Sequence, residues 1–145
     1  MGSNYPTSVD DYGSEQSVAV QTELGANAGR KTEIITVDET MAIADNNTTY
    51  IADAVDLTIT LPAVATVGAN VRVEAIVATV SAITGLSISP AAADAIHGGG
   101  LTSVDDKDLI NTAATDAEGD SVSLVSDGVD GWFITAINGT WAKEA

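Results

Sequence analysis

The single histidine and the acidic side chains are the residues from which a catalytic or metal site would have to be built, because the chain has no cysteine. His97 stands before a run of glycines, Gly98 to Gly100. A lone histidine cannot form a zinc site, and a histidine base needs a partner that orients its ring. The glycine run lacks the Gly-Lys-Ser/Thr ending of a phosphate-binding loop. We therefore interpret His97 as a turn residue and the glycines as a loop.

Two acidic clusters offer the oxygen ligands that Ca²⁺ prefers. They are Asp105, Asp106 and Asp108, and then Asp116, Glu118 and Asp120. Neither cluster follows the EF-hand spacing, and runs of like charge are usually solvated, so we predict no metal and no cofactor, with structural calcium as the alternative. A serine nucleophile would have only His97 as its base, and no Gly-x-Ser-x-Gly motif is present. The sequence therefore predicts a protein that is not an enzyme, with no catalytic residues.

Three aromatic residues near the end of the sequence offer a different chemistry, because exposed rings can stack on sugars. They are Trp132, Phe133 and Trp141. The alternative is that they fill one end of a core that is otherwise poor in large side chains, since Phe133 is the only phenylalanine and the chain has no other tryptophan. Buried aromatic rings remove much apolar area from water, so we favour the core interpretation.

The charge balance excludes some partners. Five basic residues against 21 acidic residues give a formal net charge of −16. The cations are scattered and form no stripe for a phosphate backbone, so we expect no nucleic-acid partner. No apolar run is long enough to cross a bilayer, and residues 1–6 lack the charged and apolar regions of a signal peptide, so we expect no membrane partner.

The elements that would position these side chains are short strands. Residues 1–31 are polar and lack a sustained period, which predicts an extended arm. Residues 32–145 alternate apolar and polar positions in short runs separated by turn residues, which predicts a β domain. The clearest strand is Val55 to Leu61, where Val55, Leu57, Ile59 and Leu61 are expected to face one way. Val71 to Val77 alternates similarly, with Arg72 and Glu74 expected to face water.

Turn residues predict how some of these strands connect. Asp127-Gly128 favours a hairpin between Ser121–Val125 and the strand from Trp132, and Asn138-Gly139 favours a second hairpin turning into Trp141. Leu86 to Pro90 repeats the form of Leu57 to Pro62, which suggests two similar hairpin elements. Strand spacing of this kind predicts an all-β fold: a compact antiparallel sandwich, jelly roll or small barrel with an extended N-terminal arm.

Several strand-and-turn segments resemble those of small tailed-phage virion proteins. The first is Thr48 to Ala69, in which Thr58-Ile-Thr-Leu-Pro62 precedes a turn containing Gly68. The others are Asp106–Thr112, Gly119–Gly128, Gly131–Phe133 and Gly139–Ala142, so the resemblance covers roughly residues 48–142 with gaps. No capsid-binding motif is matched residue by residue, so no contact residues are assigned.

The resemblance implies a virion structural protein of the head decoration (cement) type, which binds the outer capsid surface and stabilises the shell. Its implied partner is the major capsid protein, and its implied oligomer is a homotrimer. A core built largely from Ala and Val also favours association with further copies. Synthesis is expected in the host cytoplasm, followed by assembly into the virion. The alternative is a tail-fibre or spike module that binds host glycans, but such a module is expected to be longer and more repetitive.

Overall fold

A computed structural model describes residues 30–145, and β-strands form most of the regular structure in this range. The predicted all-β class is therefore confirmed. The helices described here are short: α2 covers Val64–Val67 and the 3₁₀ helix η2 covers Ile43–Asp45. The arm predicted for residues 1–31 lies outside the described residues, except for Arg30 and for Lys31, where the first described strand begins.

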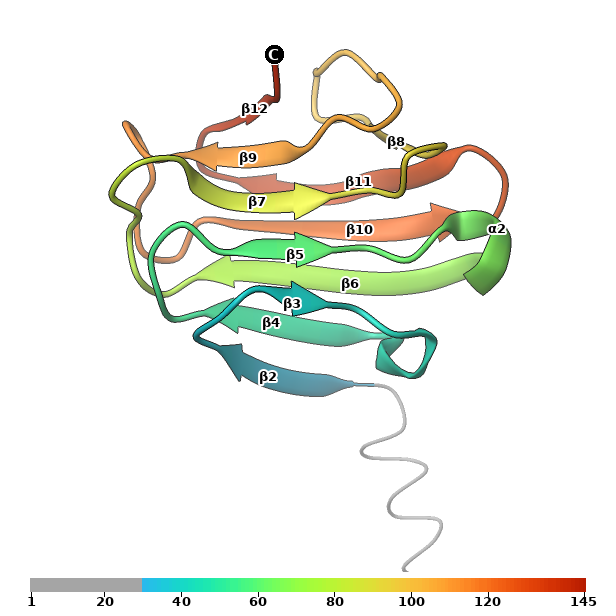
Figure 1. Cartoon of the computed structure of the whole chain (residues 1–145), viewed down its shortest axis with the longest axis horizontal. Helices are drawn as coiled ribbons and strands as arrows, with labels where there is room; N and C mark the ends of the chain where they lie inside the picture. The colour runs from blue at the N-terminus through green and yellow to red at the C-terminus, as the bar shows by residue number, and fades with distance from the viewer. Residues whose placement is uncertain (1–29) are drawn as a thin grey trace, which may run out of the picture. The chain divides into compact units, whose positions relative to one another are not determined.

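The strands form two sheets (Figure 1). The first sheet has the order β2-β4-β6-β10-β11-β8, with β2 at Lys31–Ile35, β4 at Thr48–Ala52, β6 at Ala69–Val77, β10 at Ser121–Asp127, β11 at Gly131–Asn138 and β8 at Ala95–His97. The second sheet has the order β12-β9-β7-β5-β3, with β12 at Trp141–Lys143, β9 at Leu109–Thr112, β7 at Gly85–Ser89, β5 at Thr58–Thr60 and β3 at Glu39–Thr40.

The first half of the described chain winds between the two sheets. Strands β2, β4 and β6 lie in the first sheet, while β3, β5 and β7 lie in the second. Each pair of successive strands makes one coil, so the next strand in a sheet runs in the same direction as the previous one. The pairs β4–β6, β3–β5 and β5–β7 are accordingly parallel. We call the segment from β2 to β7 the coil stack.

The expected antiparallel architecture is therefore wrong for this half of the fold. A jelly roll is antiparallel, whereas residues 30–145 form two sheets that each mix parallel and antiparallel pairs. The alternating apolar pattern is the same in parallel and antiparallel strands with one buried face, so it could not distinguish the two arrangements.

The repeat from Leu57 to Pro62 and from Leu86 to Pro90 marks successive coils and not two hairpins. Strands β5 and β7 pair in parallel, with Thr58 opposite Ser87 and Ile59 opposite Ile88. Both isoleucines are buried, at most 1% exposed. Like residues therefore stack on like residues, because neighbouring coils present the same positions to the same core.

The remaining strands are mostly antiparallel. Strand β10 pairs with both β6 and β11, and the hairpin predicted at Asp127-Gly128 joins β10 to β11. The hairpin predicted at Asn138-Gly139 is wrong, because β12 crosses to the other sheet and pairs with β9. Trp141 on β12 is 7% exposed, so the crossover places a large apolar ring in the core.

The core lies between the two sheets, and the longer strands contribute the side chains of one face to it. Strand β6 follows the prediction, since its alternate residues Val71, Val73, Ala75 and Val77 are buried while Arg72 is exposed. Glu74 is only half-buried, and its carboxylate accepts hydrogen bonds from the hydroxyls of Thr49 (3.0 Å) and Ser123 (3.4 Å). The prediction that Val55 faces the core with Leu57 is wrong: β5 begins at Thr58, and Val55 is exposed in the preceding turn.

Candidate functional site

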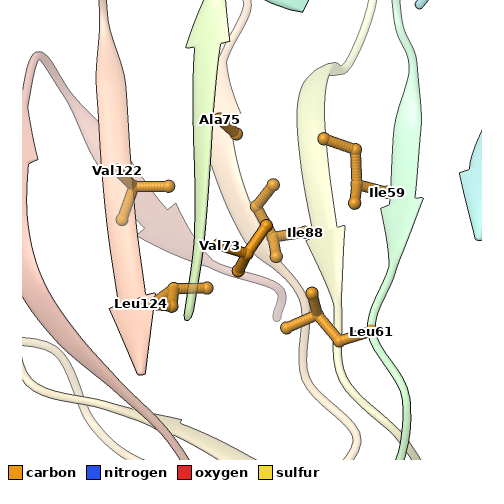
Figure 2. A pocket seen from close by; sticks show the side chains of 7 residues that line it. All are labelled: Ile59, Leu61, Val73, Ala75, Ile88, Val122 and Leu124. Atoms are coloured by element: carbon orange, nitrogen blue, oxygen red, sulfur yellow. The ribbon is translucent and has the colours of Figure 1, made fainter. Parts of the chain in front are cut away.

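The small cavity between the two sheets is lined by apolar side chains and has no polar group for a ligand or a reaction. Figure 2 shows its lining, which consists only of carbon side chains: Ile59, Leu61, Val73, Ala75, Ile88, Val122 and Leu124. The space between them does not admit a water molecule. A ligand site needs convergent polar groups in a larger concavity, so this gap is a packing feature of the core.

His97 is the last residue of strand β8 and not a turn residue, which corrects the interpretation from sequence. Its neighbour on the paired strand β11 is Phe133, and the two rings stack with centroids 4.5 Å apart and planes 17° apart. The His97 Nε2 atom has no hydrogen-bond partner among the described residues. The following glycines, Gly98 to Gly100, all have positive φ, as expected for a loop.

The side chains of the first acidic cluster differ in their exposure. Asp105 and Asp106 are exposed, and Asp108 is half-buried. Burial raises the pKa of Asp108, and the nearby carboxylates of Glu144 and Asp106 raise it further, although a hydrogen bond from Ser89 opposes them. Within residues 30–145, no group of three or more His, Cys, Asp or Glu side chains is placed to hold a metal ion.

The second acidic cluster stabilises turns. Asp120 is 6% exposed, and its Oδ2 accepts hydrogen bonds from Asn111 Nδ2 (3.0 Å) and from the Ala117 amide (3.1 Å). Asp116 Oδ2 accepts a hydrogen bond from the Ser81 amide at 2.6 Å. The exposed Glu118 does not join these contacts. The three residues are therefore neighbours in sequence but do not act together: Asp120 and Asp116 bind different backbone segments, and Glu118 faces solvent.

The aromatic residues are divided in the same manner. Trp132 is fully buried and Trp141 is 7% exposed, so both belong to the core, as the favoured interpretation predicted. Phe133 points to the other side of β11 and is 42% exposed. The three rings therefore form no joint sugar-binding platform. Phe133 instead pairs with His97, and this is the ring pair found at the surface within residues 30–145.

Two aspartates that link neighbouring turns, Asp56 and Asp38, were not singled out from the sequence. Asp56 Oδ1 accepts hydrogen bonds from the amides of Ile83 (3.1 Å), Thr84 (2.8 Å) and Gly85 (3.1 Å) in the next coil. Hydrogen bonds from the Gly85 and Thr84 amides lower the pKa of Asp56. Asp38 Oδ1 accepts from the Thr58 amide at 2.9 Å in the same way. Each of these carboxylates ties one coil to the following one.

Beside these aspartates, aliphatic side chains project into solvent. The turns after β2, β4 and β6 lie at one end of the coil stack, because those strands run in the same direction (Figure 1). Their exposed aliphatic residues are Val37, Val55, Val80 and Ile83, which we call the aliphatic turn face. The repeated Val-Asp pair in the first two turns, Val37-Asp38 and Val55-Asp56, was the available sequence signal.

No helix within residues 30–145 is long and apolar enough to cross a membrane. No protein-family model and no curated protein matches this chain.

Proposed function

We propose that this chain is a non-enzymatic head decoration protein of a tailed phage, which binds the outer capsid surface and stabilises the shell. Its proposed partners are the major capsid protein and two further copies of itself in a homotrimer. Its proposed location is the outer surface of the virion, after synthesis in the host cytoplasm.

The observation that carries the proposal is the use of polar side chains between residues 30 and 145. Carboxylates in this range, such as those of Asp56, Asp116 and Asp120, accept hydrogen bonds from backbone amides of neighbouring turns. None of the described carboxylates is grouped for metal binding. A fold whose polar groups fix its own turns suits a protein whose task is mechanical support.

Two further features support the same function. The segments that resemble virion proteins, which lie with gaps between Thr48 and Ala142, include strands of both sheets: β4 and β10 of the first, and β5 and β9 of the second. The net charge of −16 favours an outer surface over one that faces packaged DNA, because like charges repel.

The experiment adds the purified protein to undecorated, expanded capsids of the phage that encodes it. Electron cryomicroscopy is expected to show added density with threefold symmetry on the outer surface. Decorated capsids are also expected to release DNA at a higher temperature than undecorated ones. Capsids that gain no density at saturating protein would overturn the proposal.

A glycan-binding tail module is the second candidate, and one observation favours it. The exposed Phe133 ring, stacked on His97 at 4.5 Å, is a surface on which a sugar ring could lie. Glycan-array binding that is lost in Phe133→Ala, with no binding to capsids, would favour this function over decoration.

A further inference from the structure

The aliphatic turn face contains the two most exposed large hydrophobic side chains of the coil stack, Ile83 and Val37. Ile83 is 81% exposed, Val37 71%, Val80 49% and Val55 48%. Single exposed aliphatic residues are ordinary on protein surfaces, whereas exposed apolar residues that share one end of a fold are candidates for a contact surface. The grouping follows from the fold, since successive coils turn at the same end of parallel strands.

Hydrogen bonds between the turns keep these side chains together. The Asp56 amide donates to Ser81 Oγ (3.2 Å), and Asp56 Oδ1 accepts from the Ile83 amide (3.1 Å), so the turns that carry Val55 and Ile83 are directly linked. Thr79 Oγ1 donates to Asp53 Oδ1 at 2.8 Å and adds a further link between the same two turns. A surface fixed in this way loses little conformational entropy when a partner binds.

The charges around the face indicate the chemistry of that partner. Carboxylates stand beside the aliphatic residues on every turn: Asp38 follows Val37, Asp53 and Asp56 flank Val55, and Asp116 contacts the turn of Val80 and Ile83. A second copy at this face would bring an identical set of negative charges into the interface. Like charges opposed across an interface are unfavourable, so a different molecule with basic groups fits better.

We propose that the aliphatic turn face is the surface by which this protein docks on the capsid shell, against an apolar patch rimmed by lysine or arginine side chains. This inference rests on the proposed decoration function and adds which end of the molecule faces the shell. The hairpin turn at Val129 lies at the other end of the strands, because β10 is antiparallel to β6, and therefore points away from the shell.

The test compares matched variants at the two ends of the protein. The double variant Val55→Ser/Ile83→Ser replaces two apolar side chains of the face with small polar ones. Val129→Ser makes the same kind of replacement at the opposite end, where the valine is 75% exposed. Binding to undecorated capsids is measured by co-sedimentation, and folding by the thermal unfolding midpoint. We expect the double variant to bind at least tenfold more weakly than the wild type, while Val129→Ser stays within twofold and all midpoints remain similar.

The outcomes separate this inference from the function on which it rests. Wild-type protein that fails to bind capsids would overturn the proposed function, and the docking face with it. Wild-type binding that the double variant retains, or that Val129→Ser loses instead, would overturn the docking face alone. Sedimentation equilibrium without capsids checks self-association: a loss of oligomer in the double variant would make the face an interface between copies. Binding that does not weaken as salt is raised would contradict the basic rim.

Discussion

At the scale of single residues, aspartate side chains serve as acceptors for turn amides. Asp127 Oδ1 accepts hydrogen bonds from the amides of Val129 (2.8 Å), Asp130 (2.9 Å) and Gly131 (3.0 Å) within its own hairpin. Asp56 plays the same part between two coils. These bonds favour the ionised carboxylate, and those from the Gly131 and Val129 amides lower the pKa of Asp127.

The first prediction concerns acid stability. A carboxyl whose pKa is lower in the folded state contributes stability that is present above its ordinary pKa of 3.8 and is lost as the pH falls through the folded value. The thermal midpoint of the wild type is therefore expected to fall as the pH drops below about 4. Asp56→Asn and Asp127→Asn should be less stable than the wild type at pH 7 and closer to it at pH 2–3.

Asp108 provides the contrasting control for this prediction. Burial raises the pKa of Asp108, so its contribution is favourable below the ordinary pKa and is lost as the pH rises through the folded value. Asp108→Asn is expected to keep or increase stability at pH 7, opposite in sign to the other two variants. Calorimetry across the pH range checks both signs. Equal pH dependence in all three variants would contradict the assignment.

The second prediction concerns Gly85, at the start of strand β7. Its φ is +109°, and a Cβ atom there would overlap the carbonyl oxygen of Asn111 on the paired strand β9. Gly119 has a similar φ of +95° but open space around it. We expect Gly119→Ala to cost ~1 kcal/mol through backbone strain, and Gly85→Ala to cost ~1–3 kcal/mol more through steric overlap. Chemical denaturation measures the difference, and equal costs would contradict the close strand approach.

At the scale of elements, the coil stack decides which segments meet. Parallel strands require a long connection between neighbours, and here that connection is a strand of the opposite sheet. Leu57-Thr-Ile-Thr and Leu86-Ser-Ile-Ser thereby lie side by side in register. If each segment had formed its own antiparallel hairpin, the two segments would not have paired with each other.

The third prediction tests this register with an engineered disulfide, which is simple to interpret because the chain has no cysteine. Thr58 and Ser87 are direct partners, so Thr58→Cys/Ser87→Cys should place its Cα atoms within the roughly 4.4–6.8 Å that a disulfide needs. Thr58→Cys/Ser89→Cys is shifted by two residues, ~6.6 Å along the strand, and should not cross-link. Mass spectrometry after mild oxidation distinguishes the two variants. Preferred cross-linking of the shifted pair would contradict the parallel register.

At the scale of the whole molecule, the excess of negative charge dominates. The net charge is −16 on 145 residues. The acidic side chains repel one another more strongly in the folded state, where they are closer together, than in an expanded chain. Among the described residues, the Lys107–Glu144 pair at 3.3 Å joins partly exposed side chains and offsets little of this repulsion.

The fourth prediction follows from that repulsion. Salt shortens the range of charge interactions from about 30 Å at 0.01 M to about 10 Å at 0.1 M. We expect the thermal midpoint of the isolated protein to rise as sodium chloride increases over this range. A midpoint that falls with salt would show that attractive ion pairs outweigh the net charge.

The fifth prediction concerns assembly and the predicted arm. The described strands begin at Lys31, so deletion of residues 1–30 is expected to leave the β domain folded while lowering capsid occupancy. The homotrimer is expected to give three times the 14.7 kDa chain mass in sedimentation equilibrium or, where it forms only on capsids, threefold density in electron cryomicroscopy. A monomer mass in solution together with no threefold density on capsids would contradict it. An unfolded truncation would place residues 1–30 in the core, and unchanged occupancy would place attachment in the β domain alone.

The sequence by itself determined the features that depend on local pattern. Alternation from Val71 to Val77 marks one buried face, because neighbouring side chains of any strand point to opposite sides. Asp127-Gly128 specifies a tight turn through backbone preferences that act over a few residues. The single histidine and the absence of cysteine likewise leave no second imidazole and no thiolate with which to complete a metal site.

Only the tertiary structure decided which strands pair and what the polar side chains contact. Asp56 lies 29 positions from Gly85, and Asn111 lies 29 positions from the Thr140 carbonyl that its side chain donates to. Residues so far apart meet because burial of apolar faces brings whole strands together, and a strand with one apolar face can be buried in either direction. The exposure of Val55 was decided at the same level. Its place in the alternation suited a strand, but the coil turns before Thr58 and leaves its side chain in solvent.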